Sequence, residues 1–563
     1  QLAHNEWDAA AGMSRPKVVY NFGREDQLDR AGVNRLIASL SRVVEPAAAL
    51  AATAPAELAF SESRPMGGAH VLDGLWQRLG IGKIMTGLAA SRRRDDRVER
   101  VLFALVANRA LAPSSKLAAA GWVCHDAHIP GLAALDEDAC YRAMDRLLEI
   151  EDELAEQVYW QVATLLDLEV DLLFFDTTST YFELDEPDTP IERDERGHPV
   201  ALDERPSPDN GANPGAGGGE SSGATVGFRS HGHSKDHRPD LPQVVVGMAV
   251  TRTGIPVRCW CWPGNTADSA LIRQVRDDLR DWKLSRIIWV ADRGFTSAEN
   301  RRYLQRGGGH YILGEKLRSG SAEATAALAR QGRYQQVADN LRVKQVRVGD
   351  GDRFVVCHNP EQAERDAALR TLMLTHLHTA IDGSDALSPT KRAELRGQIS
   401  TKPGLNRYLR VTPGGLLRVD AKAIAAETKL DGKYLLRCSD PTLSPEDIAL
   451  GYKQLLEVER GWRDMKQIID LRPVYHRKEE RIRAHVVLCW LALLLIRIIE
   501  TTCDQTWTTL RGELQRLHVG VFTGPAGTFR QRTEITTAQR NILAKLDLTA
   551  PPKIVELTPN PAV

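Results

Sequence analysis

The sequence predicts a mixed α/β fold whose core is interrupted before its last helix. Three observations support this prediction. Short apolar runs at 172–175 and 287–291 are typical of buried strands, and an aspartate follows each of them. Apolar residues at three- and four-residue spacing predict helices throughout 65–168. Between 316 and 430 the pattern changes to short strands, and helical spacing returns after 440.

The length and composition indicate an ordinary globular protein with several domains. The chain has 563 residues, of which 42% are hydrophobic and 26% charged. The net charge of -1 gives no overall basic field, which counts against a simple DNA-coating protein but leaves room for an enzyme with one basic face. The eight cysteines include no CxxC pair, so we expect reduced thiols in the cytoplasm and no structural zinc. The apolar run 486–496 is about half of the roughly 20 residues that a membrane span needs, so we expect a core helix and no membrane partner.

Changes in composition divide the chain into parts. One stretch of the core, 184–230, is rich in Gly, Ser, Asn and Pro around its centre, and we expect it to be a disordered insertion. The basic cluster Arg92-Arg93-Arg94 is either a solvated loop or a DNA-backbone contact. The expected parts are an N-terminal segment (1–64), an all-helical domain (65–168), the first part of the α/β core (169–315), a mostly β insertion (316–430), the second part of the core (431–505) and a C-terminal tail (506–563).

Two aspartates end predicted strands. Asp176 follows Leu172-Leu173-Phe174-Phe175, and Asp292 follows Ile287-Ile288-Trp289-Val290-Ala291. Adjacent strands would bring both carboxylates to one edge of the sheet, where their repulsion is costly unless a cation neutralises it. The alternatives are aspartates that cap turns, or a phosphatase-type nucleophile at Asp176. The second requires another Asp two residues on, where this chain has Thr178.

A third acidic residue lies in a helical pattern with a phenol and a cation. Offsets of 7 and 14 residues place Glu459 and Lys466 within about 40° of Tyr452 at roughly 100° per residue. The alternative is a solvated charged face. Segment 453–485 contains nine Lys and Arg against six Asp and Glu, so it is locally basic within a neutral chain. A carboxylate ringed by cations suits a polyanionic substrate.

Taken together, Asp176, Asp292 and Glu459 predict a magnesium site for phosphodiester chemistry. Hard divalent cations prefer carboxylate oxygens. Three convergent carboxylates can hold the two ions of an in-line displacement at phosphorus.

These motifs resemble those of the DDE transposases of bacterial insertion sequences, in the branch marked by a Tyr-x2-Arg-x3-Glu-x6-Lys signature. Here the signature is Tyr452, Leu455, Glu459 and Lys466, with Leu455 replacing the Arg. Three other segments are similar to that family: 232–243, 264–268 and 291–295.

The resemblance implies a ribonuclease-H-like catalytic core with a mostly β insertion, preceded by an all-helical DNA-binding domain. It also implies that Asp176, Asp292 and Glu459 are the catalytic metal ligands, with Mg²⁺ as cofactor and Mn²⁺ able to substitute. The implied activity is cleavage at the ends of an insertion sequence, followed by joining of the 3′-hydroxyl to target DNA. The implied partners are double-stranded DNA and a second copy of the chain, in a cytoplasmic, nucleoid-associated protein.

Five residues are the expected DNA contacts under the resemblance. Leu455 cannot grip a phosphate, so Arg460 or Arg463 is expected to replace the signature Arg. Two other functions remain open: a catalytically silent protein that binds transposon ends, and a metal-dependent nuclease or phosphatase. The expected DNA contacts are Tyr452, Lys466, Lys235, Arg238 and Arg463.

Overall fold

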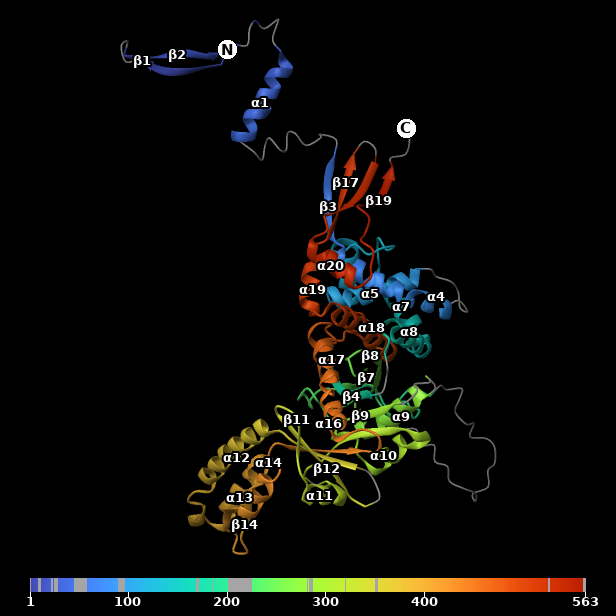
Figure 1. The fold of residues 1–563 in the computed structure, drawn as a ribbon, viewed down its shortest axis with the longest axis vertical. Helices are drawn as coiled ribbons and strands as arrows, with labels where there is room; N and C mark the ends of the chain where they lie inside the picture. The colour runs from blue at the N-terminus through green and yellow to red at the C-terminus, as the bar shows by residue number, and fades with distance from the viewer. Residues whose placement is uncertain are drawn as a thin grey trace. The chain divides into compact units, whose positions relative to one another are not determined.

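The fold is described from a computed structural model of the chain (Figure 1). The chain forms two compact units, 68–514 with 541–549, and 1–67 with 515–540 and 550–563. The structure describes residues 2–8, 12–21, 24, 29–44, 58–89, 97–168, 172–184, 186–200, 225–280, 282, 287–318, 320–349, 353–524 and 527–559.

A nine-stranded mixed sheet forms the centre of the larger unit, in the order β11-β12-β13-β16-β10-β9-β4-β7-β8. Strands β4, β9 and β10 are parallel to one another, and all other neighbours are antiparallel. The strands are β4 (Leu172–Tyr181), β7 (Gln243–Thr251), β8 (Pro256–Pro263), β9 (Ile288–Ala291), β10 (His310–Glu315), β11 (Gln335–Ala338), β12 (Leu341–Arg347), β13 (Arg353–His358) and β16 (Lys433–Cys438).

Helices flank this sheet. Helix α16 packs on β9, β10, β12, β13 and β16, and α17 packs on β4 and β7. Both therefore lie over the strands that carry the two candidate aspartates. The elements are α9 (Asp268–Arg280), η3 (Arg293–Phe295), α10 (Ala298–Leu304), η4 (Arg306–Gly308), α11 (Ala322–Ala329), α16 (Pro445–Lys453) and α17 (Leu456–Gln467).

The apolar run near 490 lies in α18 (Glu479–Cys503), which packs against β8, α5, α7 and α17. Within the described part of the chain, α18 is the one helix long and apolar enough to cross a membrane, and its apolar window is wholly buried inside the protein. A helix that is apolar on all sides needs such burial.

Helices fill the segment 67–166. Two of them, α5 and α7, pack directly on α18, so this block shares a core with the sheet-bearing part of the unit. Capping residues set some boundaries: Ser115 accepts from the backbone N–H of Ala118 at the start of α6, and Asp136 does the same for Ala139 in α7. The cluster Arg92-Arg93-Arg94 lies outside the described residues. The helices are α3 (Gly67–Arg78), α4 (Ile81–Ala89), α5 (Arg97–Leu111), α6 (Lys116–His125), α7 (Glu137–Glu149) and α8 (Glu151–Leu166).

The expectation of a disordered insertion over 184–230 is wrong at both of its flanks. Short strands β5 (Ile191–Glu192) and β6 (Thr225–Val226) pair with each other. Arg193 is buried and forms an ion pair with Glu479 at 2.9 Å. Phe228 is also buried, with Arg193 and Arg483 over its ring. Composition did not predict these buried contacts, because the Gly-rich centre, 201–224, dominates the average composition of the segment. That centre lies outside the described residues.

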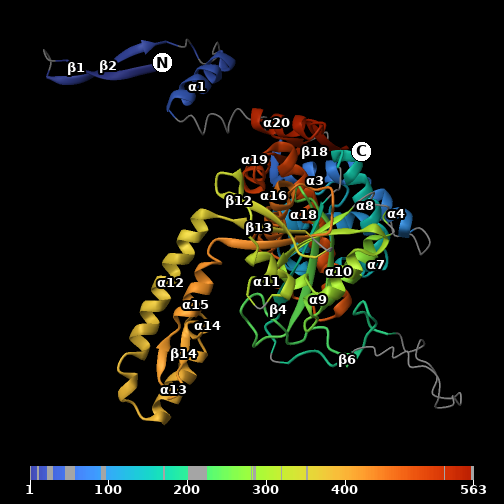
Figure 2. The same ribbon diagram turned by 60° about the horizontal axis from the view of Figure 1, so that its bottom comes forward.

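The expectation of a mostly β insertion over 316–430 is also wrong. Its first strands, β11 to β13, extend the central sheet, and its remainder is mainly helical. Leu377, Ile399 and Tyr408 form the buried core of that remainder, whose helices lie side by side in Figure 2. The elements are α11, already given, then α12 (Pro360–Ile381), η5 (Ser384–Ala386), α13 (Pro389–Ser400), α14 (Pro403–Asn406), β14 (Leu409–Val411), β15 (Leu417–Val419) and α15 (Ala421–Thr428).

The expected C-terminal tail is structured. Its three strands form an antiparallel sheet with β3, in the order β19-β18-β17-β3, so residues near both ends of the chain share one sheet. The elements after 506 are α19 (Trp507–Leu514), β17 (His518–Gly524), β18 (Gly527–Arg532), α20 (Thr537–Lys545) and β19 (Ile554–Pro559). Before residue 66 they are β1 (Leu2–Asp8), β2 (Met13–Tyr20), α1 (Arg30–Val44) and β3 (Ala59–Pro65).

Candidate functional site

The two predicted aspartates end up at corresponding positions of neighbouring parallel strands. The register of β4 and β9 pairs Phe174 with Val290 and Phe175 with Ala291. One residue further, Asp176 corresponds to Asp292. Residues that correspond in a parallel pair point to the same face of a sheet. The expectation that the two carboxylates lie side by side therefore agrees with the strand pairing. The expectation that Asp176 ends its strand is wrong, because β4 continues to Tyr181 in register with β7.

The turn after β9 holds Asp292 in place. Its side-chain oxygen accepts a hydrogen bond from the Gly294 backbone N–H at 2.7 Å and caps the short helix η3. A Cβ on Gly294 would lie 2.9 Å from the same oxygen, so the glycine leaves room for this cap. Phe295 is buried, and its ring meets Phe175 at 5.4 Å between centroids. In the sequence Asp292-Arg293-Gly294-Phe295, the carboxylate thus caps the turn and the buried phenylalanine holds the turn against the sheet.

Lys235 and Asp268 complete the surroundings of Asp176. Lys235 Nζ lies 3.9 Å from Asp176 Oδ1 and 3.0 Å from Asp268 Oδ2, and donates to the Thr177 carbonyl oxygen at 2.7 Å. Thr177 Oγ1 donates to Asp268 Oδ1 at 2.8 Å. Burial raises the pKa of Asp176 to about 6 against the opposing effect of Lys235, and the nearby charges of Asp292 and Asp268 raise it further.

Asp268 is the acidic residue of this cluster that we did not predict as a site residue. Its signal was present, because it ends the segment 264–268 that carries part of the family resemblance. As the first residue of α9 it also suits an ordinary helix start, where an acid is stabilised by the N–H groups of the first turn. Because Asp268 suits a helix start, nothing in the sequence pointed to its contact with Lys235.

Tyr452 lies beside the two aspartates. Gly314 on β10 follows Leu313, the partner of Ala291, so it occupies the position next to Asp292. A Cβ on Gly314 would lie 2.4 Å from Tyr452 Oη. The absent side chain thus makes space for the phenol, which stacks on Tyr434 at 6.0 Å between ring centroids. Burial raises the pKa of Tyr452 well above its usual range, and the charges of Asp292 and Asp176 reinforce this.

The single helix stripe expected for Tyr452, Glu459 and Lys466 is wrong. Tyr452 belongs to α16 and the other two to α17, with Gln454 and Leu455 between the helices. The backbone there makes i to i−3 hydrogen bonds, for example from Leu455 N to Tyr452 O at 3.0 Å. Such bonds turn the chain by about 120° per residue instead of about 100°, which rotates α17 relative to the predicted stripe.

Glu459 itself is exposed on α17. Among the described residues, no three His, Cys, Asp or Glu side chains lie close enough together to hold a metal ion. The structure therefore sets Asp176 beside Asp292 by strand register and does not gather these two and Glu459 into one set of metal ligands.

The cations expected to contact DNA are mostly engaged with carboxylates. Lys466 Nζ and Arg472 Nη1 each lie 2.9 Å from Asp236. Arg238 forms an ion pair with Asp240 at 2.8 Å. Arg460, one of the two expected substitutes for the missing signature Arg, pairs with Glu500 at 3.0 Å. Arg463, the other, is exposed.

The donor set at the β4–β9 edge fits a divalent cation in part. Two aspartates lie side by side there, and burial, with a smaller contribution from the charges of Asp292 and Asp268, raises the pKa of Asp176 despite Lys235. A hard cation accepts carboxylate oxygens and would relieve this repulsion.

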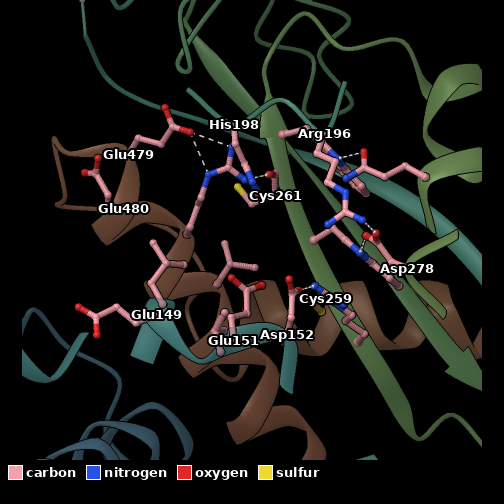
Figure 3. A pocket seen from close by; sticks show the side chains of 18 of the residues that line it. Glu149, Glu151, Asp152, Arg196, His198, Cys259, Cys261, Asp278, Glu479 and Glu480 are labelled. Atoms are coloured by element: carbon pink, nitrogen blue, oxygen red, sulfur yellow. Dashed lines mark hydrogen bonds and ion pairs between the residues drawn. The ribbon is translucent and has the colours of Figure 1, made fainter. Parts of the chain in front are cut away.

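A separate hollow of about 400 Å³ lies where α8, β8, α9 and α18 meet (Figure 3). It contains none of the predicted site residues. Several of its acids are neutralised in place: Asp152 pairs with Arg258, Glu479 with Arg483 at 2.8 Å, and Asp278 accepts from Trp260 Nε1 at 2.9 Å. Burial raises the pKa of Glu151 on its wall to about 7. Most of the charged groups named here are therefore paired within the protein.

Residues 219–495 match the family model described as a transposase DDE domain. This segment includes Asp292, Tyr452, Glu459 and Lys466, but not Asp176. No curated protein matches the chain. Among solved structures, the chain is similar to a piggyBac transposase in a synaptic complex with hairpin DNA, at 9% sequence identity and a TM-score of 0.34, over 86% of this chain and 82% of that one. The domain match supports a DDE transposase, an enzyme class that cleaves and transfers DNA strands.

Proposed function

We propose that this protein is a DNA transposase that cleaves the ends of its insertion sequence and joins the freed 3′-hydroxyl to target DNA. The observation that carries the proposal is the pairing register of β4 and β9, which sets Asp176 beside Asp292. Asp292 lies inside the transposase DDE domain match and Asp176 lies outside it. The strand register therefore connects Asp176, which only the sequence pattern identified, to the matched domain that contains Asp292.

The strand order supports a ribonuclease-H-like core. Strands β8, β7 and β4 form an antiparallel meander, and β9 and β10 continue it in parallel with β4. Asp292 follows the carboxyl end of β9, and Asp176 lies at the corresponding position of β4, which continues to Tyr181. Helix α17 packs on β4 and β7, so Glu459 belongs to a helix that contacts the strand of Asp176.

Asp176 and Asp292 would hold Mg²⁺, or Mn²⁺ in its place, and Glu459 would complete the set when α17 adjusts on DNA binding. Bound there, the metal supplies activation of the attacking water or 3′-hydroxyl and stabilisation of the leaving oxygen. The chain's own residues position the reactants. The Lys235 ammonium neutralises carboxylate charge at the β4 edge, and Tyr452 presents a phenol that stays protonated at neutral pH.

The DNA backbone would be held by Lys466, Arg463, Lys235 and Arg238, with Tyr452 beside the reacting strand. Lys466 and Arg238 now pair with Asp236 and Asp240, and phosphates would compete for these cations. Cleavage at two paired ends requires two catalytic sites, so we also propose a homodimer on the paired ends, in a cytoplasmic, nucleoid-associated protein.

The test uses a labelled duplex that carries the element's terminal repeat, beside a scrambled duplex, with Mg²⁺. Asp176→Asn, Asp292→Asn and Glu459→Gln should each lower strand cleavage by roughly a thousandfold or more while end binding changes little, because positioning and charge supply the catalysis. Glu457→Gln, two residues from Glu459 on the same helix, is the matched control and should keep its activity.

The other outcomes identify the alternatives. Binding without cleavage by the unaltered chain would indicate a silent protein that binds ends. Equal cutting of both duplexes would indicate a general nuclease. Full activity of Glu459→Gln would remove that residue from the metal site.

A further inference from the structure

A cavity of about 570 Å³ lies between the start of α6 and the segment that joins α17 to α18. It is outside the Asp176–Asp292 cluster, and no predicted site residue lines it. Four cationic or titratable nitrogen-bearing side chains form its wall, each with 7% or less of its surface exposed. They are Arg109, Lys116, His476 and His485.

None of these four side chains forms an ion pair with a carboxylate among the described residues, although the nearby charge of Asp470 acts on Arg109. Arg109 Nη1 donates to the backbone carbonyl oxygens of Asp470 at 3.2 Å and Ile469 at 3.5 Å, and its Nε has no hydrogen-bond partner. Lys116 Nζ lies 3.5 Å from His485 Nδ1. His485 Nε2 lies 3.2 Å from the Leu471 carbonyl oxygen, so it carries the proton and leaves Nδ1 to accept from Lys116.

The cations of this cluster oppose one another's charge. Burial, together with the charge of Arg109, lowers the pKa of Lys116 to about 7. Burial lowers the pKa of His476 to about 3, with Lys116, Arg481 and Arg109 adding to the effect. The pKa of His485 falls for the same reasons. A buried cation without a counter-ion is costly, so the cavity favours an anion.

A helix start and neutral groups complete the lining. The first turn of α6, from Ser115 to Ala118, faces the cavity and adds the partial positive charge of a helix N-terminus. Ser114 and Tyr141 add hydroxyl groups, and that of Ser114 donates to Asn108 Oδ1 at 3.3 Å. The acid on the wall, Glu137, accepts from Tyr141 Oη at 2.9 Å and is not among the groups that shift the pKa of Lys116.

We propose that this cavity is a binding site for a phosphate-class oxyanion, held by Arg109, Lys116 and the N-terminus of α6. Buried cations and a helix start that line one cavity are features that recognise such a group, and the cavity is large enough to admit it. The anion comes either from a DNA backbone or from a free phosphate. The inference does not rest on the proposed transposase activity.

The first test adds inorganic phosphate to the full-length chain, with chloride at equal ionic strength as the control. Phosphate should raise the melting temperature in a saturable way, because a ligand that binds only the folded state stabilises it. It should also move the ring resonances of His476 in an NMR spectrum, since an anion there offsets the charges of Lys116 and Arg109. A melting temperature that follows ionic strength alone, with an unmoved His476, would overturn the proposal.

Variants at Lys116 sharpen the test. Lys116→Met should weaken phosphate binding by at least about tenfold, as expected for one lost charge-assisted hydrogen bond. Without phosphate it should be as stable as the parent chain or more so, because an uncompensated buried charge is gone. Lys116→Arg should keep phosphate binding, and Lys83→Met, at an exposed lysine on α4, should leave it unchanged. Equal phosphate affinity in Lys116→Met and the parent chain would contradict the assignment.

Competition separates the two sources. If phosphate competes with a DNA duplex, and Lys116→Met weakens duplex binding and flattens its salt dependence, a backbone phosphate occupies the cavity. If Lys116→Met loses phosphate binding but keeps the parent's affinity for the duplex, the site takes a free phosphate compound. Both outcomes retain the oxyanion site, and loss of DNA cleavage in the Asp292 variant bears on neither.

Discussion

A glycine decides how closely the phenol of Tyr452 approaches the two aspartates. Gly314 corresponds in register to Asp292, and any side chain there would collide with Tyr452 Oη. The sequence shows only a glycine inside a predicted strand, which usually marks a bulge or a close approach. Which of these applies depends on a helix that lies more than a hundred residues further along the chain, so local pattern could not identify the contact.

Gly314→Ala should therefore disturb the site. The added Cβ would meet Tyr452 Oη at 2.4 Å, and we expect a loss of about 1–3 kcal/mol of unfolding free energy, as for other overpacked cores. Denaturant titration measures it. Tyr452→Phe in the same chain should recover part of the loss, because the colliding oxygen is removed. Gly397→Ala, where no atom lies within 4 Å of the new Cβ, is the control and should be neutral or stabilising. Equal effects at both glycines would refute the crowding argument.

At the same scale, the sequence predicted that Asp176 and Asp292 lie on neighbouring strands, and the register of β4 and β9 agrees. The prediction that both aspartates end their strands holds for Asp292 only. Asp176 lies in the middle of β4, because pairing with β7 carries that strand on to Tyr181. Asp268 and Lys235 were harder. Their contact depends on side-chain reach across three elements, which residue spacing does not encode.

At the scale of elements, the helix around Glu459 shows the limit of periodicity. Extrapolating 100° per residue across fourteen residues assumes one uninterrupted helix, and a two-residue tightening between α16 and α17 is enough to move Glu459 off the predicted stripe. The position of α17 is set instead by tertiary contacts. Arg497 on α18 is 2% exposed and lies 2.7 Å from both Asp464 of α17 and Glu500 of α18.

Removing that cation should loosen α17. Arg497→Met leaves Asp464 and Glu500 buried without their shared partner, and we expect a loss of about 3–5 kcal/mol, the usual cost of breaking a buried ion pair from one side. Burial already raises the pKa of Asp464 against the effect of Arg497. Chemical denaturation gives the stability, and hydrogen exchange should show faster exchange in α17.

Arg460→Met is the matched control for this prediction. Arg460 also contacts Glu500, but 39% of its side chain is exposed, so the loss should stay within about 1 kcal/mol. If the two variants lose the same stability, the buried network does not hold α17.

At the scale of the whole molecule, the sequence predicted the order of helical block, interrupted α/β core and apolar final helix. It did not predict that β11, β12 and β13 continue the central sheet, because a strand's partners are not visible in its own sequence. For the same reason, the segment after residue 506 was expected to be only a C-terminal tail. Pairing of β17 with β3 joins residues some 460 positions apart, and a 3.4 Å hydrogen bond from Ser61 Oγ to the Val521 carbonyl crosses it.

The helical excursion between β13 and β16 offers a test of how the larger unit is built. Its ends already meet: Asn359 N donates to the Gly432 carbonyl oxygen at 2.8 Å, and His358 pairs with Lys433 in the sheet. The excursion has its own core around Leu377, and its ion pair from Glu427 to Arg318 is half-exposed at the arginine. Few interactions therefore tie it to the sheet.

Deleting 360–431 joins Asn359 directly to Gly432 and creates an Asn-Gly loop of two residues between paired strands. This dipeptide is the preferred loop of a two-residue hairpin, and Gly432 already has a positive φ of 63°. We expect the shortened chain to fold, with a single cooperative thermal transition and a midpoint within roughly 5 °C of the parent chain, since only an exposed ion pair and a few polar contacts are lost. A Pro-Pro loop in the same deletion is the control and should unfold at a lower temperature, because proline cannot adopt a positive φ. A broad, non-cooperative transition in the Asn-Gly chain would mean that the helical excursion is part of the folding core. The hydrophobic cluster around Leu377 and the core of the sheet would then stabilise one cooperative unit.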